Sequence, residues 1–302
     1  MKEIRIGTRG SRLALWQAKM VQSQLTEQGQ PSTLVIIKTK GDRIQHLGFD
    51  KLEGKGFFTK EIEEALLQGT VDLAVHSLKD LPTEQPEGLA LAGLSYREDP
   101  ADLLLIHPRA FVKGADLSLM AAPVVGTSSV RRKAQMRHLL PDCEVKDLRG
   151  NVPTRVSRLA EGDYDAIILA AAGVRRLDLD LGDLKALRLH PKEFVPAPGQ
   201  GVIAYQVRAD DKATRTAVLK LHNADSAAIT NVERRVLQLM EGGCQTPLGV
   251  HGEKDQAGNY HFWAAWAPDL DKALIQVRVS QNTHFGIAEA IVSKLKNHIV
   301  PS

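Results

Sequence analysis

The chain has 302 residues, of which 43% are hydrophobic and 25% are charged, and its formal net charge is +3. This composition is typical of a globular protein and excludes a disordered chain, a collagen-like repeat and a disulfide scaffold. At roughly 100–200 residues per domain, the length predicts two or three domains. The sequence has no run of about 18 apolar residues, so no membrane-spanning segment is expected.

The first part of the chain alternates strand and helix patterns. The expected elements are a strand over 3–7, a helix over 11–28, a strand over 33–39, a helix over 57–68 and a strand over 71–75. The continuous apolar run of the 33–39 strand predicts burial on both of its faces. Residues 41–56 contain four glycines and little periodicity, which predicts a long functional loop.

A second stretch follows the same order. It predicts a strand over 123–126, helices over 128–140 and 152–161, and a strand over 164–172. Two pairs of residues fall at matching places, Gly69 with Gly162 and Asp72 with Asp165. An internal duplication explains this match, and chance similarity between common α/β patterns is the alternative. Alternating strands and helices predict mainly parallel sheets with helices on both faces.

The last third has a different pattern. It predicts helices over 210–222 and 226–241, strands over 248–252, 260–267 and 274–280, and a closing helix over 285–297. These elements form a small α+β domain. Prolines cluster in 189–198, which together with 95–100 we take as the linkers.

Positive charge is concentrated between residues 120 and 160, where eight Lys and Arg face three Asp and Glu. Arg131 and Arg132 fall in the first turn of a predicted helix that follows Gly126-Thr127-Ser128-Ser129. Two arginines are unfavourable for the dipole at that position, so an anion site formed with the helix N-terminus explains them better. An ordinary serine cap with solvent-facing arginines is the alternative.

Three further segments contain residues suited to chemistry. Arg149-Gly150-Asn151 with Arg155, and Arg9 with Ser11, repeat the pattern of basic and polar residues at a helix start. Lys79 and Asp80 follow the predicted 71–75 strand, where an ionised carboxylate in a positive environment would stabilise a developing cation. A solvated turn is the alternative for each of these segments.

The sequence contains two cysteines, which form neither a disulfide framework nor a metal-ligand spacing. Cys244 lies on a predicted polar loop, with two glycines before it and Pro247 after it, so an accessible thiol or a covalent attachment point is expected there. Cys143 is interpreted as structural. The cysteine usage and the absence of a signal pattern predict a reducing cytoplasm, and no metal site is expected.

Seven motifs in order resemble one family. They are GTRGSRLALWQA, GKGFFTKE, VHSLKDLP, REDPAD, GTSSVRR, LRGNVPTR and EGGCQTPLG. Together they are similar to the porphobilinogen deaminase (hydroxymethylbilane synthase) family over essentially the whole chain. Val130 and Gln245 depart slightly from the family pattern, and residues beyond Gly249 match only loosely.

The resemblance implies an α/β fold with two similar doubly wound lobes resembling type II periplasmic binding proteins, plus a small α+β C-terminal domain. It implies three domains, namely 1–96 with 198–216, then 97–197, then 217–302. It also implies one dipyrromethane cofactor per chain, held through a thioether to Cys244. The implied enzyme is a transferase that condenses four porphobilinogen molecules head to tail, loses ammonia each time and releases hydroxymethylbilane with water.

The resemblance also implies roles for residues. Asp80 would be the catalytic aspartate, stabilising the azafulvenium cation that the loss of ammonia leaves. The implied cofactor-binding residues are Cys244, Lys79, Ser77, Thr127, Ser128, Ser129, Arg131, Arg132, Arg149 and Gly150. The implied substrate-binding residues are Arg9, Ser11, Gln17, Arg149, Arg155, Arg176 and Lys55. The 41–56 loop would act as a lid.

Two rival interpretations use the same residues. A two-lobe anion-binding protein without catalysis would share the fold but would need no reactive cysteine. A nucleic-acid binder would be expected to interleave aromatics with its arginines, and residues 120–160 contain none. We therefore expect a small-molecule substrate, no nucleic-acid partner, no membrane partner and a monomer.

Overall fold

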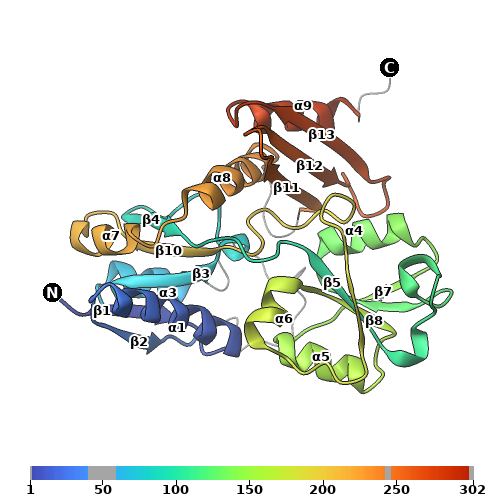
Figure 1. The fold of residues 1–302 in the computed structure, drawn as a ribbon, viewed down its shortest axis with the longest axis horizontal. Helices are drawn as coiled ribbons and strands as arrows, with labels where there is room; N and C mark the ends of the chain where they lie inside the picture. The colour runs from blue at the N-terminus through green and yellow to red at the C-terminus, as the bar shows by residue number, and fades with distance from the viewer. Residues whose placement is uncertain (1, 40–58, 242–245, 299–302) are drawn as a thin grey trace. The chain divides into compact units, whose positions relative to one another are not determined.

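The computed structural model describes residues 2–39, 59–241 and 246–298. The chain divides into two compact units, one formed by Met1–Glu98 and Gly201–Ala228 and the other by Asp99–Gln200 and Ile229–Ser302. Each unit is described separately (Figure 1). The three-domain division remains a prediction. Among the described residues, none of the helices is both long and apolar enough to cross a membrane.

The first unit contains a five-stranded mixed sheet. In sheet order its strands are β2 (Ser32–Ile36), β1 (Ile4–Thr8), β3 (Leu73–Ser77), β10 (Ile203–Arg208) and β4 (Leu89–Leu94). Strand β1 pairs in parallel with β2 and β3, whereas β10 runs antiparallel to β3 and β4. The carboxyl ends of β1 and β3 therefore lie at the same edge of this sheet.

Helices cover both faces of this sheet. Helix α1 (Arg12–Glu27) and helix α7 (Lys212–Leu219) pack on one face, where Val21 and Val218 belong to the same apolar cluster. Helix α3 (Lys60–Leu67) covers the other face through Ile62 and Leu66. Ser11 caps α1, as the sequence predicted, because its hydroxyl accepts a hydrogen bond from the N–H of Ala14.

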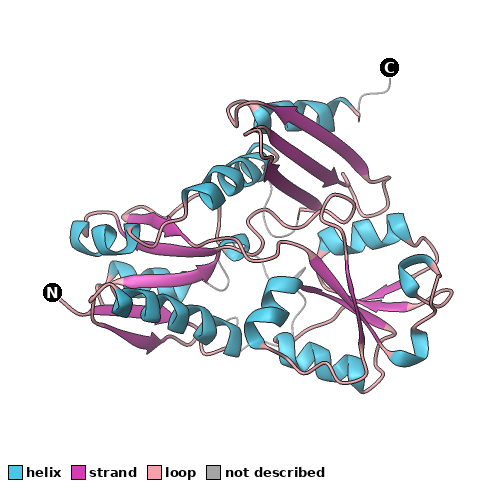
Figure 2. Cartoon of the chain, in the orientation of Figure 1, coloured by secondary structure: helices cyan, strands magenta, loops and turns pink. Residues whose placement is uncertain are grey.

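The second unit repeats the arrangement with a sheet of the same topology (Figure 2). In sheet order its strands are β7 (Glu144–Lys146), β6 (Val124–Gly126), β8 (Ala166–Ala170), β5 (Asp102–Ile106) and β9 (Lys185–Arg188). Helix α4 (Val130–Leu139) packs on one face, and α5 (Val152–Ala160) and α6 (Ala171–Leu177) pack on the other.

Asp72 and Asp165 occupy equivalent positions in the two sheets. The N–H of Asp72 donates to the carbonyl of Arg5, and its carboxylate accepts from the N–H of Arg5 at 3.1 Å. Asp165 exchanges the same two hydrogen bonds with Val124, the second at 2.8 Å. Asp72 and Asp165 thus form equivalent hydrogen bonds in two sheets of the same topology. The two lobes are therefore similar, as the sequence predicted.

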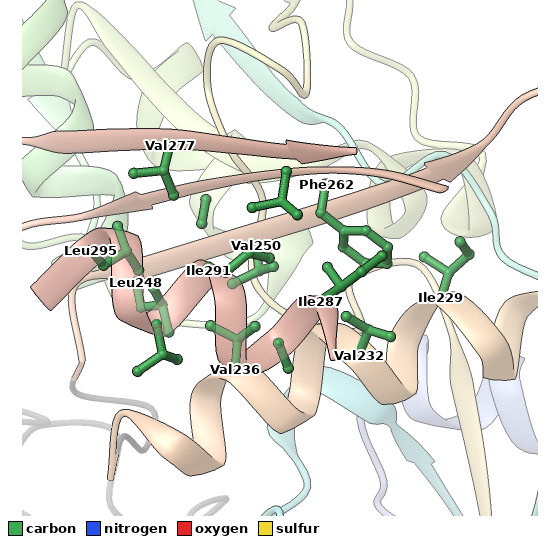
Figure 3. Packing of buried hydrophobic residues seen from close by; sticks show 14 residues of the cluster. Ile229, Val232, Val236, Leu248, Val250, Phe262, Val277, Ile287, Ile291 and Leu295 are labelled. Carbon is green, nitrogen blue, oxygen red and sulfur yellow. The ribbon is translucent and has the colours of Figure 1, made fainter. Parts of the chain in front are cut away.

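The remainder of the second unit is a three-stranded antiparallel sheet. Its strands are β11 (Leu248–Lys254), β12 (Tyr260–Trp266) and β13 (Ile275–Gln281). The first five residues of β11 are buried, whereas β13 places Val277 and Val279 inside and the residue between them outside. Helices α8 (Ala224–Leu239) and α9 (Ile287–Asn297) pack against one face of the sheet around Phe262, as Figure 3 shows. This is the small α+β domain that the sequence predicted.

In each of the two larger sheets four strands run in one direction, in line with the expected mainly parallel sheets, and one strand that the sequence did not predict, β10 or β5, pairs antiparallel with both neighbours. Two expectations about the elements were wrong. Strand β2 is not buried on both faces, because it lies at a sheet edge and Ile36 remains 58% exposed. The apolar run ending at Ala172 is not a single strand, because β8 ends at Ala170 and α6 begins directly after it.

Candidate functional site

In the first unit, the predicted catalytic aspartate lies on a short 3₁₀ turn, η2 (Leu78–Asp80), directly after β3. Leu78 is fully buried, and its N–H donates to the carbonyl of Val202 at 2.9 Å. Lys79 is half-buried and Asp80 is exposed. The turn therefore holds the Asp80 carboxylate in contact with solvent on an anchored backbone.

Two other predicted site residues meet beside this turn. Gln17 on α1 is buried, and its Nε2 donates to Ser77 Oγ at 2.9 Å. Ser77 is the last residue of β3, and Arg9 follows β1, the parallel neighbour of β3. The structure therefore gathers Gln17, Ser77 and Asp80 at the carboxyl edge of this sheet, where ligands of α/β folds bind.

His76 is buried behind the same turn. Burial lowers its pKa to about 4, the hydrogen bond to Gln206 acts in the opposite direction, and the nearby charge of Arg9 lowers the pKa further. His76 is therefore neutral at neutral pH.

In the second unit, Thr127, Ser128 and Ser129 connect β6 to α4. The Ser128 hydroxyl donates to the carbonyl of Leu148 at 2.9 Å and accepts from the N–H of Leu148 at 3.1 Å. Ser129 caps α4 by accepting from the N–H of Arg132. The Ser128 hydroxyl therefore fixes the loop after β6 to the loop after β7, so the residues following both strands are held together.

Arg131 and Arg132 do not face solvent as the ordinary-cap alternative requires. Both are buried, and both pair with Asp102, the first residue of β5, which is fully buried. Arg131 Nη1 lies 2.7 Å from Asp102 Oδ2, and Arg132 Nη2 lies 2.6 Å from Asp102 Oδ1. Gln200 Nε2 also donates to Asp102, at 2.9 Å.

The ion cluster is unbalanced. Burial by itself would raise the pKa of the Asp102 carboxyl, but the guanidinium groups of Arg131 and Arg132 hold it well below its usual range. One carboxylate thus faces two buried cations, which leaves one positive charge beside the N-terminus of α4. Because the pyrrole rings of dipyrromethane carry acetate and propionate groups, the residues present fit that cofactor.

The loop after β7 carries the second basic group. Gly150 has a φ of 103°, and a Cβ there would lie 2.8 Å from Thr154 Cγ2, so only glycine fits without strain. Arg155 Nε donates to the carbonyl of Gly150 at 2.8 Å, and Arg149 is half-buried. Arg176 lies near the end of α6 and is 7% exposed.

Two predicted site residues, Lys55 and Cys244, and the predicted lid lie outside the described residues. Cys143 is half-buried, and burial raises the pKa of its thiol. A raised pKa reduces the reactive thiolate, in line with a structural role for Cys143.

Asp102 is the residue that the sequence interpretation missed. The REDPAD motif contains Asp102, but this residue lies 29 positions before Arg131 in the sequence, and no local pattern predicts an ion pair over that separation. Only the antiparallel placement of β5 beside β8 brings Asp102 next to the start of α4.

Comparison with known proteins is consistent with these features. The sequence model of a family described as "Porphobilinogen deaminase, dipyromethane cofactor binding domain" matches residues 4–216. A curated porphobilinogen deaminase of Chloroherpeton thalassium is 41% identical over 293 residues, covering 96% of this chain and 90% of that protein. One of Trichlorobacter lovleyi is 46% identical over 253 residues, covering 83% and 79%.

Among solved structures, the chain is similar to solute-binding proteins. An arginine-specific periplasmic binding protein of Salmonella typhimurium aligns with a TM-score of 0.42 at 11% identity, over 75% of this chain and 94% of that one. A probable amino-acid transporter binding protein of Bacillus subtilis gives 0.44 at 12%, over 73% and 90%. This likeness is weak, whereas the sequence relatives match over most of the chain at more than 40% identity. The chain belongs to the porphobilinogen deaminase family.

Proposed function

We propose that this chain catalyses the porphobilinogen deaminase reaction, in which four porphobilinogen molecules are joined head to tail with loss of one ammonia each. Water then releases the linear product, hydroxymethylbilane. The observation that carries the proposal is the match of curated porphobilinogen deaminases over most of the chain. The rival, an anion-binding protein without catalysis, is not favoured, because the matching family model describes a cofactor-binding domain of that enzyme.

The basic residues of the second unit are proposed to bind carboxylates. Arg131 and Arg132 supply the unbalanced buried charge, and Ser128 and Ser129 hold the loops around it. Charge-assisted hydrogen bonds from guanidinium groups to carboxylates are strong and directional. The remaining proposed carboxylate-binding and polar residues are Thr127, Arg149, Gly150, Arg155 and Arg176 in this unit, and Arg9, Ser11, Gln17, Ser77 and Lys79 in the other.

Asp80 is proposed as the catalytic group. Its exposed carboxylate on an anchored turn can accept a hydrogen bond from a pyrrole N–H of the substrate. A fixed negative charge at that place stabilises positive charge that develops when ammonia leaves. When bound, dipyrromethane supplies the primer from which the product chain is extended, and Cys244 is proposed to hold it. Lys55 is proposed as a further substrate-binding residue.

Intact-protein mass spectrometry tests the proposed attachment. The purified chain is expected to exceed its polypeptide mass by one dipyrromethane, and Cys244→Ser to lose this increment. Cys143→Ser is the matched control and should keep it, because burial raises the pKa of that thiol. A wild-type protein that converts porphobilinogen at its bare polypeptide mass would overturn the proposed cofactor.

A second measurement tests the reaction itself. Wild-type protein given porphobilinogen should release ammonia and a product that cyclises with loss of water to a uroporphyrinogen, whereas an anion-binding protein would return porphobilinogen unchanged. The proposal also includes a cytoplasmic location and a monomer. Sedimentation at micromolar concentration would reveal a dimer, which would contradict the proposed monomer.

A further inference from the structure

The amide of Gln206 lies buried behind the Asp80 turn. Gln206 is on β10, is fully buried, and pairs in the ladder with Ala74 of β3. Its Nε2 donates to Gln85 Oε1 at 2.9 Å and to Glu63 Oε1 at 3.2 Å. Its Oε1 lies 3.1 Å from His76 Nε2. A single side chain thus contacts three segments of the first unit.

The direction of these hydrogen bonds is determined by their chemistry. The Glu63 carboxylate can only accept, so the Gln206 amide nitrogen faces it and the amide oxygen faces His76. His76 must then donate from Nε2. Since burial lowers its pKa to about 4, His76 is neutral with its proton on Nε2.

The same network reaches the far end of the turn. Gln85 Nε2 donates to the carbonyl of Pro82 at 3.1 Å, and Pro82 closes the segment that begins at Ser77. His76 directly precedes Ser77 in β3. Gln206 is therefore hydrogen-bonded to His76, two residues before the turn, and through Gln85 to Pro82, two residues after it. Asp80 lies between these two attachments.

We propose that Gln206 is a positioning residue, which fixes the Asp80 turn from behind by binding His76 before the turn and, through Gln85, Pro82 after it. The inference rests on the proposed catalytic role of Asp80. A buried amide that loses a hydrogen bond costs free energy, because water cannot replace the lost partner. A buried network in which every polar group is hydrogen-bonded therefore restricts the motion of the segments that it joins. Gln206 does not touch substrate in this scheme, and it acts only through the backbone that carries Asp80.

Gln206→Met tests the inference, since methionine has a similar length but forms none of the three hydrogen bonds. We expect kcat to fall about tenfold or more, as for other residues that orient a reacting group. The KM and the dipyrromethane mass increment should stay near wild type, because no carboxylate-binding residue changes. Hydrogen exchange, which needs no activity, should speed up at the Leu78 and Leu81 amides in the variant.

Gln206→Glu separates the two halves of the network. A carboxylate still accepts from His76 Nε2 but no longer donates to Gln85, so kcat should recover only in part, and a carboxylate beside His76 raises the pKa of that histidine. The nearby charge of Arg9, after β1, opposes that rise, and Glu63 on α3 faces residue 206 itself, since its Oε1 lies 3.2 Å from Gln206 Nε2. We expect an added ionisation in the kcat–pH profile of this variant that is absent from the wild type.

A matched control comes from the same unit. Gln30 is also a buried glutamine, and its Nε2 donates to the carbonyls of Lys2 and Pro31 at the opposite end of β1. Gln30→Met should lower stability but leave kcat and the exchange of Leu78 and Leu81 unchanged. If Gln206→Met does not fold, Gln85→Met breaks the path from Gln206 through Gln85 to Pro82, leaves the bond to His76 in place, and should still lower kcat.

The outcomes distinguish this inference from the proposed function. If Asp80→Asn loses turnover while Gln206→Met and Gln85→Met keep a wild-type kcat, Gln206 has no positioning role and the proposed function stands. If Asp80→Asn keeps turnover, the catalytic role of Asp80 fails. In the Asp80→Asn background Gln206→Met should cause no further loss of kcat, and a fully additive loss would overturn the inference.

Discussion

Asp102 and Arg132 form a doubly hydrogen-bonded pair in the interior of the second unit, with Arg132 Nε and Nη2 both within 3.2 Å of Asp102 Oδ1. Arg131 occupies the other carboxylate oxygen at 2.7 Å. The start of β5 and the start of α4 are therefore joined by ion pairs, in addition to the apolar cluster that Leu104 of β5 shares with Met136 of α4. Because all three side chains are buried, the removal of the only carboxylate among them leaves two cations facing each other.

Asp102→Asn is expected to destabilise the protein by about 3–5 kcal/mol, because breaking a buried ion pair leaves uncompensated charge. Denaturant unfolding measures the effect. Asp271→Asn is the matched control, since Asp271 is 91% exposed and lies 3.5 Å from Arg137. That surface pair should contribute less than about 1 kcal/mol. Equal losses for the two variants would show that the buried cluster is not what holds β5 to α4.

Arg131→Leu and Arg132→Leu should behave differently from Asp102→Asn. Each variant leaves one guanidinium paired with Asp102, so the cluster becomes neutral. The loss of unfolding free energy should therefore be smaller than that caused by Asp102→Asn. The lost charge is the one proposed to bind carboxylates of the cofactor. We therefore expect folded protein with little or no dipyrromethane mass increment.

Arg137→Leu is the control for this prediction, because Arg137 is on the same helix but is 45% exposed. It should load cofactor normally. If Arg131→Leu and Arg132→Leu purify with a full increment and normal kinetics, the two arginines serve only to hold Asp102 and do not bind carboxylates of the ligand.

Asp80→Asn should lower turnover by about 100-fold or more, because the amide removes a fixed charge that stabilises a developing cation. The mass increment should remain, since Asp80 lies outside the second-unit cluster. Ammonia release at saturating porphobilinogen measures the effect. Glu87→Gln, an exposed acid of the same unit, should turn over normally. Wild-type rates for Asp80→Asn would remove this carboxylate from the mechanism.

Local patterns predicted much of the fold. The matching Gly69 and Gly162 both have a positive φ, and Asp72 and Asp165 make equivalent hydrogen bonds. The glycine conformation depends on a local turn, and the aspartate hydrogen bonds depend on an adjacent strand of the same lobe. Both are therefore determined by sequence within one lobe. The elements that the sequence analysis missed include β10 and β5. Strand β10 joins a sheet whose other strands lie more than 100 residues earlier in the chain, and no local pattern predicts that pairing.

The site was predictable in type but not in partners. Arg131 and Arg132 stood out because cations at a helix start oppose its dipole, which indicated a binding site for an external anion, and that site stays a prediction. The anion that the structure shows beside them is Asp102, 29 residues before Arg131 in the chain, and no periodicity connects the two segments. Gln206 gave no signal at all, because a glutamine in a strand is unremarkable until its buried partners are known.

The last prediction concerns how the unfolding free energy changes at acid pH, and it involves Glu253 on β11. The hydrogen bond with His251 at 3.1 Å and the ion pair with Lys192 at 2.8 Å lower the pKa of Glu253 to about 2 from 4.5. A carboxyl whose folded pKa is depressed adds stability above its unfolded pKa, and this stability is lost as pH falls through the folded pKa. The contribution should thus be complete above about pH 4.5 and fade towards pH 2.

Glu253→Gln removes this titration. The difference in unfolding free energy between wild type and Glu253→Gln should be constant near neutral pH and should shrink as pH falls below 4.5. The magnitude will be modest because Glu253 is 40% exposed and solvent screens the pair. In a His251→Asn background the difference should already be smaller at neutral pH, because the largest cause of the shift is gone. A difference that stays constant from pH 6 to pH 3 would contradict the pairing of Glu253 in the folded state.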